Sequence, residues 1–247
     1  DARKARLVAG SAVARLDRRT AAAIGVSEGA KSLERRLNGA EAGAFLIAKD
    51  VAGEPGFAAR RDGSVALRRD FGAFAVTLAG ESGKVWHDVE TSATGSPYRW
   101  TSVALDRRLG ATWLSAGLAR LEEKQTLLGG RMGEVLGGGG SSSLFLDLEA
   151  RRAFGHGLSA GLTARHGWTQ FAAGRFQTDA FALDVAKQGV LGSGDLLGFR
   201  LAQPLRVSNG GLAMMLPTSY DYSTLTATSS WSTYSLTPSG REIDAEL

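Results

Sequence analysis

The chain has 247 residues, with 33 glycines, only 5 prolines, no cysteine and a formal net charge of +4. The lack of cysteine excludes a disulfide scaffold, a thiolate metal site and a cysteine nucleophile. The basic residues are spread along the chain, so nucleic acid is not an expected partner, and no apolar run approaches the roughly 18 residues of a membrane-spanning helix.

The N-terminal part predicts a hairpin followed by a short helix. Two strands of small and apolar residues are expected over 6–16 and 21–28, with a charged turn between them. The helix is expected over 30–38, because Leu33 and Leu37 are four residues apart and an Asn-Gly pair follows them. A further strand is predicted over 44–50.

The clearest hairpin covers residues 144–168. Leucine or alanine occupies the even positions of its first half, and successive side chains of a strand point to opposite faces. One face is therefore apolar and the other polar, and a Phe-Gly-His-Gly turn at 154–157 joins the two strands. The polar face carries four charged residues: Asp147, Glu149, Arg151 and Arg165.

The same design recurs, and it predicts the fold class. Further hairpins are expected over 64–78, 101–121 and 196–216, the last with a turn at Asn209-Gly210. Longer polar connections are expected over 80–97, 122–143, 169–175, 188–194 and 217–230. Short turns that alternate with long loops, and strands of about 9–11 residues, are typical of outer-membrane barrels. We therefore predict an all-β, antiparallel up-and-down β-barrel of about 12–14 strands with one short helix.

Alternation alone leaves open which face is buried, because soluble sandwiches and lipocalin-like barrels place the apolar face inside. Three features favour the membrane: small and charged residues opposite the leucines, the regular order of connections, and aromatic residues near strand ends. The aromatic residues are Trp86, Tyr98, Trp100, Trp168, Tyr220, Tyr222, Trp231 and Tyr234. Arginine pairs beside the short turns (68–69, 107–108 and 151–152) would lie at one membrane interface.

In such a barrel the charged residues of the central hairpin would face the lumen. The predicted lumen charge network consists of Asp147, Glu149, Arg151 and Arg165. Its simplest role is to satisfy buried charges, and contact with a passenger segment in the pore is a compatible second role.

No catalytic residue, metal or cofactor is expected. His87, His156 and His166 have no partner at metal-ligand or triad spacing, and His87-Asp88 near Ser92 is only a weak triad match. Residues 137–143 resemble a phosphate loop in composition but lack its lysine. The alternatives left open are an outer-membrane lipase or protease, which needs a Ser/His pair, and a soluble secreted β-domain for binding or adhesion.

Four segments resemble a known family: VSEGAKSLERRL, GEPGFAARRDGSVALRRDFG, LGFRLAQPLRVSNGGLAMMLP and LTPSGREIDAEL. They begin at Val26, Gly53, Leu197 and Leu236. They are similar to the C-terminal, autotransporter-like β-barrel region of subtilisin-family (S8) serine peptidases of alphaproteobacteria, sphingomonads especially.

The resemblance implies one autotransporter-like barrel domain over 1–247, at the cell surface of a Gram-negative bacterium. The domain would be a non-catalytic translocator or anchor for a secreted N-terminal passenger. Its expected partners are outer-membrane lipid, the passenger segment and the barrel-assembly machinery. The peptidase domain is absent, since the chain holds no Gly-Thr-Ser-Met-Ala segment. We further expect closing strands beyond Leu247, or a different mode of closure.

Overall fold

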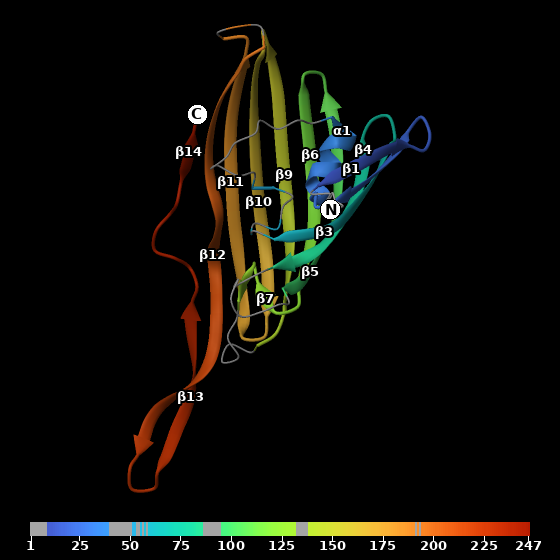
Figure 1. The fold of residues 1–247 in the computed structure, drawn as a ribbon. Helices are drawn as coiled ribbons and strands as arrows, with labels where there is room; N and C mark the ends of the chain where they lie inside the picture. Colours follow the sequence, from blue (N-terminus) through green and yellow to red (C-terminus); the bar gives the residue numbers. More distant parts are fainter. Residues whose placement is uncertain are drawn as a thin grey trace, which may run out of the picture.

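The computed structural model describes residues 9–39, 51, 52, 55, 57, 59–85, 95–131, 138–190, 192 and 194–247. It is mostly antiparallel β-sheet with one helix, which confirms the predicted all-β class (Figure 1). The elements are β1 (Gly10–Arg15), β2 (Thr20–Val26), α1 (Ala30–Asn38), β3 (Arg60–Asp70), β4 (Ala75–Val85), β5 (Ser96–Leu109), β6 (Thr112–Glu123), β7 (Thr126–Leu127), β8 (Gly130–Arg131), β9 (Ser141–Gly155), β10 (Leu158–Phe171), β11 (Gly174–Gln188), β12 (Leu196–Asp221), β13 (Thr226–Ser235) and β14 (Asp244–Glu246).

The strands form one meander in which chain neighbours are also spatial neighbours. The order is β1-β2-β3-β4-β5-β6-β9-β10-β11-β12-β13, with β14 beside β12, so the sheet has 12 strands. In the part of the chain that the structure describes, β1 does not pair with β13, and the sheet is open. The predicted strand over 44–50 lies outside the described residues.

The sheet is strongly curved around α1. Leu205 of β12 packs against a core cluster that also holds Leu33 of α1 and Trp100 of β5. We call the face that carries α1 the inner face and the opposite face the outer face. The helix has the predicted bounds, and it ends at Gly39 with a φ of 66°, the left-handed conformation common after a helix.

The hairpin of β9 and β10 has the predicted turn. His156 and Gly157 both have positive φ, of 52° and 76°, which is the type I′ geometry that matches the twist of paired strands. The register places Asp147 directly opposite Arg165.

The predicted turn at Asn209-Gly210 is wrong, because β12 runs through it without reversing. Thr178 pairs with Val207 and Gln177 with Asn209, so the register shifts by one residue here. The extra residue of this bulge is Ser208, while Asn209 and Gly210 stay paired with Gln177 and Phe176 of β11. Past Leu212 β12 changes partner from β11 to β13, so its backbone groups stay paired and the chain reverses only at 222–225. Figure 1 shows the resulting hairpin of β12 and β13 reaching past the other strands.

Gly210→Ala is expected to destabilise the fold by about 1–3 kcal/mol, because its φ is +95° and the sheet is crowded there. A Cβ would lie 2.5 Å from the Arg175 carbonyl oxygen and 2.7 Å from the Phe176 Cα. Urea unfolding measures the loss, with Gly240→Ala as control, since a Cβ at Gly240 meets nothing within 4 Å. Equal stability of the two variants would contradict the expectation.

The connections differ from prediction at several places, among them 217–230, which belongs to β12 and β13 apart from the turn at 222–225. The expected long connection over 169–175 is a tight turn between Phe171 and Gly174, because its polar residues belong to the strands. A longer link, 189–195, lies at the end that holds the other short turns. The predicted loop over 122–143 contains the small β7–β8 hairpin.

Candidate functional site: the charged inner face

The two faces of the sheet invert the usual pattern of a water-soluble protein. Polar and charged side chains are buried on the inner face: Ser64, Thr77, Glu81, Asp106, Ser115, Asp147, Glu149, Thr163, Arg165, Thr178, Asp184 and Arg200. Large apolar side chains are exposed on the outer face: Ile24, Val65, Leu67, Leu78, Val103, Leu105, Leu114, Leu118, Leu144, Leu148, Leu162, Leu183, Val185 and Phe199.

Asp147 and Arg165 form a bidentate ion pair on neighbouring strands. The Arg165 Nε and Nη2 atoms donate to the two Asp147 carboxylate oxygens at 2.7 and 2.9 Å. The guanidinium also lies 4.7 Å from the ring centre of Phe145 and 5.4 Å from that of Trp100. Arg165 is only 3% exposed. Planar, bidentate pairing and aromatic stacking are the two arrangements that suit a buried arginine.

Glu149 pairs with the helix and not with Arg165. The Lys31 Nζ donates to Glu149 of β9 and, at 3.0 Å, to Glu34 one turn along α1. All three side chains are about 5% exposed or less. This ion triad therefore fastens α1 to the middle of the inner face.

The triad shifts the pKa of its helix members. Burial disfavours the Lys31 ammonium, but Glu149 and Glu34 outweigh burial and raise the pKa of Lys31 above 10.5. Burial raises the pKa of Glu34 more than Lys31 lowers it. Because the folded pKa of Lys31 is raised, its contribution to stability is complete at neutral pH and is lost as pH rises through that raised value.

Arg151, the fourth predicted residue, lies apart from the other three. Its Nη1 is 3.9 Å from Asp184 of β11, and Asp184 also accepts from Arg200 of β12 at 3.1 Å. A comparable pair joins Arg68 of β3 to Asp106 of β5 at 2.5 Å. The four predicted residues thus belong to three separate ion groups, and the charged inner face extends from β3 to β12.

Glu81 of β4 provides the cap that the helix sequence lacks. Its Oε2 accepts from the backbone N–H of Ala30 at 2.6 Å, and its Oε1 accepts from the Tyr98 hydroxyl at 2.9 Å. A carboxylate at a helix N-terminus is favourable both as an acceptor and through the helix dipole.

The predicted position near the membrane interface is wrong for two of the aromatic residues. Tyr98 and Trp100 lie on the inner face, 3% and 1% exposed, where they fill the core beside α1. They share the phase of Asp106 along β5, not that of the outer leucines. Exposed aromatics remain at Trp168 and on the hairpin of β12 and β13, while Trp86 lies outside the described residues.

The histidines bring no catalytic pair together in the described ranges. The His166 Nδ1 is 2.5 Å from Asp179, and Ser208 hydrogen-bonds that same carboxylate. His156 is an exposed turn residue. His87, Asp88, Ser92 and Gly137 lie outside the described residues.

Sequence reasoning missed Lys31, Glu34, Glu81 and Arg200. The only local signal was the spacing of Lys31 and Glu34, which is that of an ordinary helix ion pair. Within the described residues, no group of three or more acidic or histidine side chains is placed to hold a metal ion. No described helix is long and apolar enough to cross a membrane.

No family model matches the chain, and no curated protein or solved structure matches it either. Its function is therefore inferred from geometry. The described inner face pairs charge with charge and holds a helix.

Proposed function

We propose that this chain is an outer-membrane β-barrel domain that anchors or translocates an N-terminal passenger and has no catalytic role itself. The observation that carries the proposal is the inversion of the two faces. In water, an outer face of exposed leucine, valine and phenylalanine far exceeds the apolar patches that monomers tolerate. In a bilayer the same face meets lipid, and antiparallel pairing satisfies the backbone.

Outward-facing basic residues support a tilted orientation in a membrane. Arg69 of β3, Arg107 of β5, Arg152 of β9 and Lys187 of β11 share the phase of the outer leucines. Successive residues of this set lie two strands apart in the sheet. The register places each residue two positions nearer the short turns than the preceding residue of the set. An advance of about 3.3 Å along the strands per roughly 4.8 Å across them is an angle of about 35°. Strands of outer-membrane barrels tilt by about this angle, so the four residues would lie at one height.

The apolar band on the outer face has the height of a bilayer. On β5 the band lies between the outward-facing residues Arg107 and Arg99, and on β9 it lies between Arg152 and Ser142. At this tilt those separations correspond to roughly 21–27 Å along the barrel axis, close to the about 25 Å of a typical apolar band.

The proposal requires both edges of the sheet to be paired within the bilayer. Unpaired backbone groups cost several kcal/mol each in hydrocarbon, so barrels leave no edge. The edges are β1 on one side and β13 with β14 on the other. They must pair with each other or with further strands. The passenger part of the proposal is supported by the resemblance of four segments to the barrel region of subtilisin-family peptidases.

Leu148→Arg tests the membrane setting, because Leu148 lies on the outer face in the middle of the band. The substitution is expected to cost about 2–4 kcal/mol in urea unfolding from phosphatidylcholine vesicles. Leu158→Arg, beside the turn of the same hairpin, is the matched control and is expected to cost about 0–1 kcal/mol. Both leucines are partly exposed, at 49% and 39%, so a water-soluble domain would tolerate both arginines.

A gel-mobility assay provides the direct test of the fold in detergent. The unboiled chain is expected to migrate differently from the boiled chain, as folded outer-membrane barrels do. An unchanged mobility, together with partition into water without detergent, would instead establish the soluble β-domain for binding or adhesion.

A further inference from the structure

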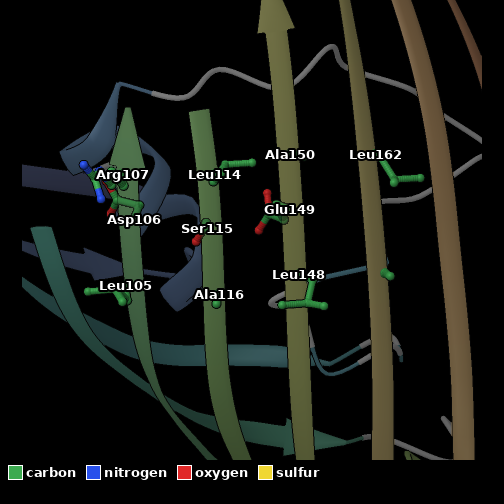
Figure 2. A pocket seen from close by; sticks show the side chains of 11 residues that line it. Leu105, Asp106, Arg107, Leu114, Ser115, Ala116, Leu148, Glu149, Ala150 and Leu162 are labelled. Atoms are coloured by element: carbon green, nitrogen blue, oxygen red, sulfur yellow. The ribbon is translucent and has the colours of Figure 1, made fainter. Parts of the chain in front are cut away.

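The outer face has a hollow of about 450 Å³ across β5, β6, β9 and β10 (Figure 2). Its walls are leucines that stand out from these strands, and its floor is formed by alanines between them. The apolar lining residues are Leu105, Leu114, Ala116, Leu148, Ala150, Leu162 and Ala164. The volume falls within the range of ligand pockets in proteins, about 300–1,000 Å³.

The register of the four strands creates this hollow. One row across the sheet reads Leu105, Ala116, Leu148, Ala164, and the next row toward the short turns reads Arg107, Leu114, Ala150, Leu162. Large and small side chains thus alternate along the first row, along the second row from Leu114 onward, and along β6, β9 and β10. Each alanine leaves a gap that its leucine neighbours enclose.

Two small side chains of the hollow and a third beyond it line up along the axis expected of the barrel. This axis runs at right angles to the line of outward-facing basic residues. Along it, each step to the neighbouring strand moves about two residues along the strand direction. The small side chains Ala164, Ala150 and Thr112 follow one another in this way across β10, β9 and β6. The path leads from the middle of the apolar band to the gap between Arg107 and Arg152.

These two arginines flank the turn-side end of the hollow. Arg107 lines it, and Arg152 is two residues beyond Ala150 on the same face. Among the described residues neither has a carboxylate partner, whereas the inward-facing Arg68 and Arg151 lie beside Asp106 and Asp184. The Arg152 guanidinium lies 5.5 Å from the ring centre of Phe154, with its charge in reach of the interface.

We propose that the hollow binds one phospholipid, with an acyl chain against the alanines and the phosphate between Arg107 and Arg152. The assignment rests on the proposed membrane function. An apolar slot suits a hydrocarbon chain, and two guanidinium groups at its end suit a phosphate, to which arginine donates bidentate, charge-assisted hydrogen bonds. The arginines are two strands apart, roughly 10–12 Å, which two long side chains can span to one phosphate.

Native mass spectrometry of the detergent-solubilised chain, titrated with dioleoyl-phosphatidylglycerol, tests the site. We expect one tightly bound lipid, and binding about tenfold weaker in Ala150→Phe, which fills the hollow, and in the double variant Arg107→Gln with Arg152→Gln. Dioleoylglycerol, which has the chains but no phosphate, is expected to bind as weakly to the original chain as phosphatidylglycerol binds to the double variant.

Two control variants lie on the same outer face away from the hollow. Arg69→Gln removes a basic residue of the same line, and Ala22→Phe on β2 adds the same bulk elsewhere. Both are expected to bind within about twofold of the original chain. Equal binding by all variants, with heat-modifiable mobility retained, would overturn the lipid site and leave the membrane anchor standing. A chain that shows no heat-modifiable mobility would overturn both.

Discussion

Lys31→Met is expected to destabilise the folded chain by about 3–5 kcal/mol, because it leaves a buried carboxylate without its partner. Lys31 and Glu149 are both about 5% exposed or less, so water cannot replace the lost ammonium. Glu34 suffers less, because burial already raises its pKa and it can take up a proton. We also expect α1 to leave the sheet more readily and to be cut faster by trypsin.

Urea unfolding from vesicles measures this loss. The double variant Lys31→Met with Glu149→Gln removes both charges and is expected to recover most of it. Arg36→Met is the matched control on the same helix, since its ion pair with Glu28 has a 53% exposed arginine and contributes about 1 kcal/mol or less. If Lys31→Met were no more destabilising than Arg36→Met, the triad would not hold the helix.

Arg165→Met is expected to cost a similar amount, about 3–5 kcal/mol, for two combined reasons. It breaks the bidentate pair and leaves Asp147 buried without that partner. It also removes a guanidinium that lies over the rings of Phe145 and Trp100. The same unfolding measurement applies.

The controls separate the ion pair from general packing. Asp147→Leu together with Arg165→Met replaces a buried pair by apolar groups, and it is expected to lie within about 1–2 kcal/mol of the original chain. Arg120→Met removes the exposed pair with Glu122 and should cost about 1 kcal/mol or less. An Arg165→Met variant as stable as Arg120→Met would show that the inner pair contributes nothing.

Strand alternation predicted much of the sheet, because the period of two is a local property of the backbone. The turn at His156 and Gly157 and the pairing of Asp147 with Arg165 follow from residues within one hairpin. The helix was predictable for the same reason, since its leucine spacing and its Asn-Gly end are local.

Contacts between residues far apart in the sequence could not be predicted from local patterns in this way. Lys31 meets Glu149 only because the curved sheet brings β9 over a helix more than one hundred residues earlier in the chain. Asn209-Gly210 has the composition of a turn, but both residues stay paired with β11, and the residues that follow find a partner in β13. In contrast, the burial of Tyr98 and Trp100 was predictable, because strand alternation places both on the same face of β5 as Asp106.

The position of α1 has a topological consequence. Its N-terminal side continues from β2 and its C-terminal side leads to β3, and these two strands pair with each other. The helix is therefore tethered at both ends to the wall that it covers. Removal of any segment before Gly10 would therefore leave α1 attached to the inner face.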